Sequence, residues 1–407
     1  MQDKKNHRFY AACPWGLEAV LEEELAACGA KRSRKTPSGV MFEGTIETAY
    51  LACLRSRIAS RVMMEVSFHD YWDSRDIYEQ ARRTPWELYF TPDQTFRISI
   101  SAHRAPLKSL EFTTLRIKDA VCRFRELAGT RPDISRESPD VQIAAFLDEK
   151  YCTLYIDLSG ESLFKRGWRT DKGEAPLKEN MAAGLLKLSG WTPDMPLLDP
   201  FCGSGTIAIE AASIACGLVP GISRSFGFEK LLNFDRELWT ELREDAKSEV
   251  NLHREVSITA SDISSIVVRK AEANALRAGL GGLLESGNLK FSVCDARNVL
   301  PPTETPGIIV ANPPYGEQST PRSATVGSMM RHVADNLKHN FAGWTAWMLT
   351  SDRHLPGEMH LKEGRKTVLF NGPLECRFFK FDLVAGSNRR VKNRDAASDG
   401  TPSDAES

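Results

Sequence analysis

The stretch LLDPFCGSGTIAIEAA, residues 197–212, joins a short apolar strand, a glycine-containing turn and an apolar helical run. Gly203 and Gly205 lie between a strand that ends at Asp199 and a helix that begins near Thr206. Glycines at that place permit a tight turn and let a ligand approach the backbone N–H groups at the helix N-terminus. The stretch therefore predicts an open α/β sheet with a ligand-binding turn at the end of a strand.

Strands and helices alternate after this turn. Helices are expected at 205–216, at 264–278 and from about 324, and the stretch 217–253 is a longer excursion. The last two strands follow each other directly, which predicts an antiparallel hairpin at one edge of a parallel sheet. Further strands are expected at 256–262, 289–296, 307–314, 346–352, 366–372 and 377–383.

The N-terminal part has a different, mixed order. Residues 8–66 read as β-α-β-β-α-β, the order of small ferredoxin-like units. Helices at 75–90 and 115–129 and a strand at 95–102 follow, and strands at 140–148 and 151–159 predict a hairpin. A polar connector ends at Pro176, where we place the main boundary.

The composition sets limits on the partners. A chain of 407 residues is expected to form two or three domains. Its 53 Lys and Arg against 54 Asp and Glu leave no global basic field, so a nucleic-acid partner has to be held by local patches. Nine scattered cysteines without a C-x-x-C pair favour reduced thiols, and we expect a soluble, cytoplasmic protein without a membrane span or a metal.

Three acids end successive predicted strands, namely Asp199, Asp262 and Asp295. Because open parallel sheets bind ligands along that edge, three solvated turns are a weaker explanation than one binding site. Asp262 follows Asp199 by 63 residues instead of the ~20 of a simple strand–helix–strand unit. The excursion at 217–253 accounts for the delay.

Two cofactors compete for the glycine turn. Gly203-x-Gly205-x-x-Ala208 satisfies the dinucleotide fingerprint, which favours NAD. A carboxylate at Asp199, however, repels a pyrophosphate and suits the ammonium of S-adenosylmethionine, which we favour. We predict that Asp262 accepts its ribose hydroxyls and that Asp295 receives its adenine amino group. The other predicted contacts are Asp199, Pro200, Phe201, Gly203 and Gly205.

A second motif, Asn312-Pro313-Pro314-Tyr315, follows the strand at 307–311 on the same predicted edge. A carboxamide oxygen and a proline carbonyl, held rigidly, can accept both N–H bonds of an exocyclic base amine. Tyr315 can stack on the base, a contact worth roughly 1–3 kcal/mol. The motif therefore predicts methyl transfer to an amine by positioning, whereas an isolated Pro-Pro-Tyr would be a simple turn.

Both motifs resemble those of class I S-adenosylmethionine-dependent methyltransferases that act on amino groups. The order of GLEAVLEEEL, IKDAV, APLKENMAAGLL, NPPYGE and NGPLECRFFK resembles the THUMP-containing RlmL/YpsC-like rRNA guanine-N2 methyltransferases over residues 8–385. The resemblance implies an α/β protein, with a ferredoxin-like and THUMP α+β region ahead of a Rossmann-like class I methyltransferase domain. The implied divisions are 1–66 ferredoxin-like, 67–165 THUMP, 166–175 linker, 176–385 methyltransferase and 386–407 a disordered tail.

The resemblance also implies an RNA substrate, most simply N2 of a guanine in large-subunit rRNA or its precursor. Residues 97–125 carry seven basic residues against Glu111 and Asp119, although a solvated helix face remains an alternative. Other enzymes with the same motif would methylate a tRNA guanine, N6 of adenine or a protein glutamine. A non-catalytic RNA-binding or chaperone module is a further alternative. The predicted RNA contacts are Arg116, Lys118, Arg123, Lys165, Arg166 and Arg169.

Overall fold

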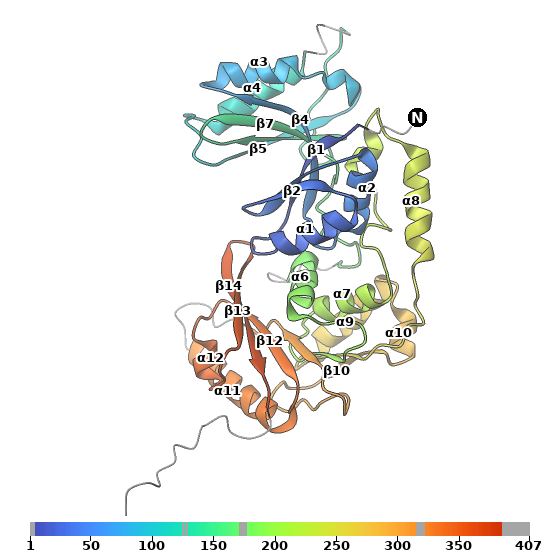
Figure 1. Cartoon of the computed structure of the whole chain (residues 1–407), viewed down its shortest axis with the longest axis vertical. Coiled ribbons are helices and arrows are strands. Elements are labelled where there is room, and N and C mark those ends of the chain that lie inside the picture. The colour runs from blue at the N-terminus through green and yellow to red at the C-terminus, as the bar shows by residue number, and fades with distance from the viewer. Residues whose placement is uncertain (1–4, 124–125, 127–128, 171–176, 315–321, 385–407) are drawn as a thin grey trace, which may run out of the picture.

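The computed structural model describes residues 5–123, 126, 129–170, 177–314 and 322–384. It contains two seven-stranded sheets, one in the N-terminal half and one in the C-terminal half (Figure 1). The N-terminal half, residues 5–170, is called the front half below. Within the described ranges, no helix is both long and apolar enough to cross a membrane.

The first sheet is continuous across both predicted N-terminal units. Its strand order is β2-β3-β1-β4-β7-β6-β5. The strand β4 (Arg61–Asp70) pairs with β1 through its first half and with β7 along most of its length, so the predicted boundary at residue 66 lies inside one strand. The elements that precede β4 are β1 (His7–Ala12), α1 (Glu18–Ala27), β2 (Lys31–Thr36), β3 (Gly39–Gly44) and α2 (Ile46–Arg55).

Two helices of the front half differ from the prediction. The helix expected at 75–90 is wrong in extent, because the chain leaves the helix after Arg83, where Pro85 lies two residues ahead. The helix expected at 115–129 begins five residues earlier, where the Ser109 hydroxyl accepts from the N–H of Phe112. The hairpin of the last two strands is confirmed. These elements are α3 (Ser74–Arg83), η1 (Trp86–Leu88), β5 (Phe96–Ala102), α4 (Leu110–Val121), β6 (Val141–Leu147) and β7 (Tyr151–Asp157).

The second sheet has the strand order β10-β9-β8-β11-β12-β14-β13. Its first five strands run parallel, and β14 enters antiparallel between β12 and β13, which confirms the predicted hairpin at one edge. The strands are β8 (Leu197–Asp199), β9 (Ile258–Asp262), β10 (Leu289–Val293), β11 (Ile308–Ala311), β12 (Thr345–Thr350), β13 (Arg365–Asn371) and β14 (Leu374–Asp382).

Helices cover both faces of this sheet. In Figure 1, α6 and α7 lie between the sheet and the front half, and one hydrophobic core runs from the first sheet through these helices to Val310. A second core on the opposite face includes Ile309, Val333 and Leu337. The helices are α6 (Glu179–Ser189), α7 (Thr206–Ala215), α9 (Ser265–Arg277), α10 (Gly281–Glu285), α11 (Arg322–Asn340) and α12 (Leu355–Glu358).

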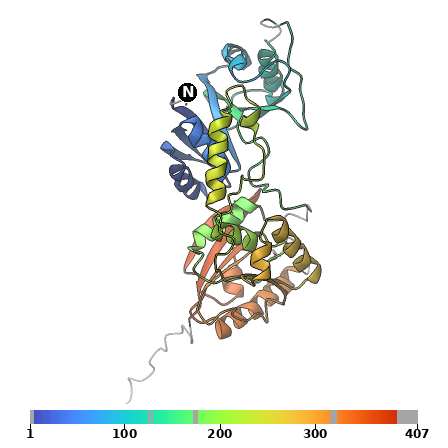
Figure 2. The ribbon, with the colours of Figure 1, turned by 90° about the vertical axis from the view of Figure 1, so that its right-hand side faces the viewer.

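The excursion at 217–253 packs against the front half. It contains η2 (Gly227–Lys230) and the helix α8 (Arg236–Ser248), which the sequence analysis did not predict. Tyr50 of α2 stacks on Phe228 at 4.1 Å between ring centroids and meets the edge of Trp239 at 6.0 Å. Figures 1 and 2 both show α8 alongside the front half. The insertion that delays Asp262 in the sequence therefore ties the two halves together.

Candidate active site

The glycine turn and the carboxamide corner lie at one edge of the second sheet. Strand β8 runs parallel to its neighbour β11, with Leu197 level with Ile308 and Leu198 level with Ile309. Asp199 is thus level with Val310, and Asn312 follows two residues later on the adjacent strand. The strand order reverses at β8, and open α/β sheets bind their ligands in the crevice at such a point.

Asp199 is the buried acid of this edge, with only 1% of its surface exposed. One carboxylate oxygen accepts from the N–H of Phe201 at 3.1 Å. Burial raises the pKa of Asp199 to about 8, and the negative charge of Asp262 adds to the rise. In the described part of the chain, no basic side chain pairs with Asp199, so a cationic ligand would meet an uncompensated carboxyl group.

The two glycines of the turn adopt left-handed backbone conformations. Gly205, with φ +86°, is the N-cap of α7, and a Cβ there would lie 3.0 Å from that of Ala271. Gly203, with φ +52°, has no heavy atom within 4 Å of the position where a Cβ would stand. Gly205 is therefore required by packing, and Gly203 leaves open space where a ligand can approach the backbone.

Asp262 bridges the ends of β8 and β9. Its two oxygens accept from the N–H of Ser264 at 2.9 Å and from the N–H of Gly203 at 3.2 Å. The carboxylate is half-buried, so part of it still faces solvent. Asp262 thus fixes the glycine turn beside the predicted ribose position, and its role as a ribose contact stays a prediction.

Asp295 stands apart from the other two acids. It follows the end of β10, and its oxygens accept hydrogen bonds from the side chain of Arg297, the shortest at 2.6 Å. The Arg297 guanidinium holds the pKa of Asp295 below its usual range. A contact between Asp295 and an adenine amino group would therefore share or displace this ion pair.

The carboxamide corner begins directly after β11. Asn312 is half-buried, Pro313 is buried and Pro314 is exposed. Pro200 and Phe201, on the neighbouring loop, are buried and half-buried. Tyr315 lies outside the described residues, so the predicted stacking platform stays a prediction.

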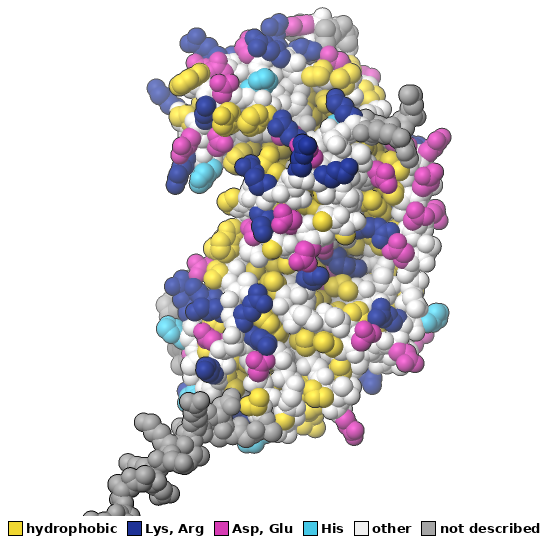
Figure 3. Space-filling model, in the orientation of Figure 1, with side chains coloured by type: hydrophobic (Ala, Val, Ile, Leu, Met, Phe, Trp, Pro, Cys, Tyr) yellow, Lys and Arg dark blue, Asp and Glu magenta, His cyan; other side chains and the backbone are white. Residues whose placement is uncertain are grey.

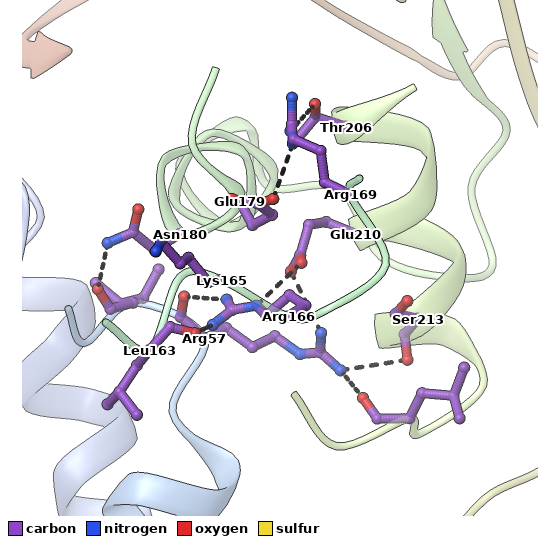
Figure 4. Close-up of polar contacts among 12 residues, drawn as sticks. Arg57, Leu163, Lys165, Arg166, Arg169, Glu179, Asn180, Thr206, Glu210 and Ser213 are labelled. Carbon is purple, nitrogen blue, oxygen red and sulfur yellow. Dashed lines mark hydrogen bonds and ion pairs between the residues drawn. The ribbon is translucent and has the colours of Figure 1, made fainter. Parts of the chain in front are cut away.

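Arg169 supports the glycine turn, a role that the sequence analysis missed. Its guanidinium donates to Ser204 Oγ at 3.1 Å. It also donates to Thr206 Oγ1 at 2.7 Å and forms an ion pair with Glu179 at 3.1 Å (Figure 4). Its side chain is 14% exposed. The spacing of more than 30 residues hid this contact, and the geometry favours a positioning role for Arg169 over the predicted contact with RNA.

Arg166 is also buried at the junction of the two halves. Figure 4 shows Arg166 and Arg57 converging on Glu210, at 3.2 Å and 3.4 Å. The side chains of Arg166 and Glu210 are 4% and 2% exposed, so the predicted RNA contact at Arg166 has no access to a phosphate in this arrangement. The single acid inside the apolar run TIAIEAASIA was the signal for such a pair, because buried charges require partners.

The other predicted RNA contacts lie on the surface of the front half or of the connector. Arg116 covers the Tyr78 ring at 4.3 Å, and Lys118 pairs with Asp119. The remaining two pair with acids as well, Arg123 with Glu87 and Lys165 with Glu161. Figure 3 shows basic and acidic side chains interspersed on the face in view, without a single large basic patch. Their contact with RNA stays a prediction.

Metal ligation finds no support in these residues. No group of three or more His, Cys, Asp and Glu residues that could hold a metal ion occurs within the described ranges. The cysteines there are all unpaired thiols, and burial raises the pKa of Cys202 beside the glycine turn. A thiol in that state is a poor nucleophile and a poor metal ligand.

Three family descriptions match consecutive parts of the chain. Residues 8–63 match the RlmL ferredoxin-like domain and residues 72–157 match the THUMP domain. Residues 166–380, more than half of the chain, match the RMKL-like methyltransferase domain. A methyltransferase identity was favoured over an NAD-binding one from the sequence, and these matches agree with that choice.

Curated relatives carry the name ribosomal RNA large subunit methyltransferase K/L. The protein from Psychromonas ingrahamii is 40% identical over 368 residues, which cover 89% of this chain and 48% of that protein. The protein from Shewanella loihica is 39% identical over 401 residues, which cover 96% of this chain and 55% of that protein. The chain thus spans about half the length of the curated relatives it matches.

Solved structures share the whole architecture. A protein described as a predicted N6-adenine-specific DNA methylase from Listeria monocytogenes is 30% identical, with a TM-score of 0.83 and coverage of 93% of this chain and 96% of that chain. The protein SMU.472, crystallised with SAH, is 28% identical, with a TM-score of 0.84 and coverage of 94% and 100%. The chain therefore belongs to the family of RMKL-like methyltransferase domains, and its ferredoxin-like and THUMP units ahead of an S-adenosylmethionine-dependent methyltransferase fold confirm the predicted fold class.

Proposed function

We propose that the chain is an S-adenosylmethionine-dependent RNA methyltransferase that modifies an exocyclic base amine, N2 of a guanine in large-subunit rRNA. The observation that carries the proposal is the pairing of loops at one sheet edge. The buried Asp199, which has no basic partner among the described residues, and the open glycine turn stand beside the rigid corner at Asn312 and Pro313.

The residues of the turn fit the cofactor. Asp199 offers a carboxyl group without a basic partner in the described ranges, which suits an ammonium, and the space above Gly203 lets a ligand approach the backbone. Asp262 keeps that turn in place and faces solvent in part. When bound, S-adenosylmethionine supplies an electrophilic methyl group on a sulfonium.

Asn312 and Pro313 would act on the acceptor amine. Such an amine is a poor nucleophile, because its lone pair is delocalised into the ring. Two acceptors, the Asn312 carboxamide oxygen and the Pro313 carbonyl, would hold its N–H bonds and favour a pyramidal nitrogen. Pro313 is buried and its φ is fixed by its ring, so the acceptors are oriented before the base arrives.

RNA would be held between the two halves. A cleft of about 970 Å³ has walls from both, and eight basic and five acidic side chains line it. Arg97 on β5 and Lys230 in the insertion are among them, and Lys165 adds a cation at the connector. Several of these cations pair with acids of the same wall, so a phosphate-tracking groove is supported mainly by Arg97, which forms no ion pair with a described residue. We propose the division given by the sequence, with ferredoxin-like and THUMP units as the RNA-binding part and Arg116, Lys118 and Arg123 as outer contacts.

The choice of large-subunit rRNA rests on the names of the relatives, and the choice of guanine N2 rests on the resemblance to guanine-N2 methyltransferases described above. Two of them are named for methylation of large-subunit ribosomal RNA. The Listeria protein, described as a predicted N6-adenine-specific DNA methylase, keeps adenine N6 as the second candidate. Both amines suit the same pair of acceptors, so the base has to be identified by experiment.

Nucleoside mapping tests the proposal. Large-subunit rRNA from a strain lacking this protein is incubated with the purified chain and S-adenosylmethionine, digested and analysed by mass spectrometry. We expect one N2-methylguanosine that is missing when Asn312→Ala replaces the wild type. Methyl incorporation only into adenosine would move the function to the second candidate. Equal incorporation by Asn312→Ala would overturn the amine-binding role of the corner.

A further inference from the structure

A second hollow, of about 690 Å³, lies between the front half and the β13–β14 hairpin. Trp15 comes from the loop between β1 and α1, and Lys178 precedes α6. Phe370, Asn371 and Glu375 come from the hairpin. Both halves of the molecule are therefore needed to form it.

Two observations relate the hollow to the proposed active site. First, Lys178 is followed by Glu179, whose partner Arg169 holds Ser204 and Thr206 of the glycine turn. Second, the registers place Asn312 level with Leu349 and hence with Phe378, three residues after Glu375. At about 3.3 Å per residue, Glu375 extends roughly 10 Å past Asn312 at the same edge.

The backbone of Trp15 is fixed by its neighbours, while its side chain is partly exposed to solvent. Its carbonyl accepts from the N–H of Phe370 at 3.3 Å, and its ring meets that of Phe370 edge-on with centroids 5.1 Å apart. The next residue, Gly16, has φ +92°, and a Cβ there would lie 2.6 Å from the carbonyl oxygen of Val368. The side chain of Trp15 nevertheless remains 41% exposed. A large aromatic surface is thus fixed at the rim of the hollow.

Lys178 contributes the positive charge of the hollow. In the described ranges, no carboxylate pairs with Lys178, whose ammonium lies 5.0 Å from the Phe164 ring centroid. Glu375 is already neutralised by Arg377 at 2.9 Å and Arg353 at 3.3 Å. Burial raises the pKa of Cys13, a further wall residue, so its thiol stays neutral. The hollow therefore offers aromatic surface, an amide and one available cation.

We propose that this hollow receives an unstacked nucleobase that flanks the methylated nucleotide, with the base stacked on Trp15 and its phosphate at Lys178. An aromatic platform beside a cation is the combination by which proteins bind single-stranded nucleic acid. The offset of the hollow from Asn312 assigns it to a neighbour of the target base. The inference rests on the proposed RNA methylation and adds a substrate position that requires the N-terminal unit.

Substitution of Trp15 tests the site. We expect Trp15→Ala to weaken binding of a single-stranded RNA oligonucleotide with the target sequence about 10-fold, because base–aromatic stacking is lost. Trp15→Phe should retain most of the affinity. The matched control is Trp72→Ala, since Trp72 is 87% exposed on the same half and lines neither the cleft nor the hollow. Fluorescence anisotropy gives the affinities, and methyl transfer should show a raised KM for RNA with kcat nearly unchanged.

The outcomes separate the site from the proposed function. Wild-type RNA affinity and KM in Trp15→Ala would overturn the site, even if methylation proceeds normally. Equal losses in Trp15→Ala and Trp15→Phe, with a lowered melting temperature, would assign Trp15 to packing alone and also overturn it. A further outcome is that the wild type binds the oligonucleotide without methylating any RNA. If Trp15→Ala then weakens this binding and Trp72→Ala does not, the base site is supported and the proposed reaction is contradicted.

Discussion

Buried acids have basic partners at the junction of the two halves and lack them, among the described residues, at the carboxyl edge of the second sheet. At the junction, Asp157 pairs with Arg61, Glu179 with Arg169, and Glu210 with Arg57 and Arg166. At the edge, Asp199 is as deeply buried, and within the described residues its hydrogen bond comes from the backbone N–H of Phe201. Burial of a charge is costly unless a partner compensates it.

The difference is the one expected between a structural acid and an acid that binds a cationic ligand, which is the role predicted for Asp199. The junction acids meet arginines of the chain itself, so their compensation is permanent. The pKa of Asp199 is raised to about 8, because burial and the nearby Asp262 act without an opposing cation from the described residues. Perturbed pKa values of this kind cluster at functional sites. The following predictions test whether the two regions respond in opposite ways when their acids are neutralised.

The largest effect is expected at the junction. Glu210→Gln removes the shared ion-pair partner of Arg57 and the buried Arg166, and removing one partner of a buried pair costs about 3–5 kcal/mol. Urea unfolding should show this loss of free energy of unfolding. Glu237→Gln is the matched control, since Glu237 is an exposed residue of α8. A loss below about 1 kcal/mol, the range of surface pairs, would contradict the comparison.

Asp199→Asn should have the opposite effect on the cofactor-free protein. Removing an uncompensated buried charge at pH 8 should raise the free energy of unfolding by about 1–2 kcal/mol, the range of many stabilising changes at strained functional sites. Affinity for S-adenosylmethionine should fall about 100-fold, since a charge-assisted bond to its ammonium is lost. Calorimetry measures both quantities. Asp93→Asn, at an exposed position, should change neither.

The stability difference between wild type and Asp199→Asn should depend on pH. The folded-state pKa is raised, so the native protein binds the proton more tightly than the unfolded chain between pH about 4 and about 8. The stability that the Asp199 carboxyl group contributes to the wild type is therefore present at low pH, and it is lost as the pH rises through that window. The advantage of Asp199→Asn should grow as the pH rises through that window, reach the value expected at pH 8, and level off above it. A constant difference would show that Asp199 is ionised throughout.

The sequence predicted the second sheet well because its signals are local. Apolar strands, Gly203 and Gly205 each encode their conformation within a few residues, and parallel strands carry Asp199 and Asn312 to one edge. The helix α8 was missed because the stretch 217–253 was treated as one long excursion. Its pattern is nonetheless amphipathic, with Trp239, Leu242 and Ala246 buried on one face.

The arginines show where sequence reasoning fails. Arg166 and Arg169 belong to a basic connector, and a basic connector beside an RNA-binding unit favours phosphate contacts. Their partners Glu210 and Glu179 lie 44 and 10 residues away, and a pairing in space leaves no periodicity in the chain. A charge count therefore cannot separate a solvent-exposed guanidinium from one that is 4% exposed between two halves.

The smallest effect is expected at the rim of the junction. Arg55 of α2 makes two hydrogen bonds to Glu249 after α8, at 2.6 Å and 2.7 Å, with side chains 31% and 53% exposed. Water screens such a pair, so Arg55→Ala should lower the free energy of unfolding by only about 0.2–1 kcal/mol, and less at high salt. Urea unfolding of the single and double variants with Glu249→Ala isolates the pair. Glu249 binds its arginine at 2.6 Å, a shorter distance than the 3.2 Å between Glu210 and Arg166. A coupling at Arg55 as large as that at Glu210 would therefore mean that geometry, and not burial, sets the strength of the junction.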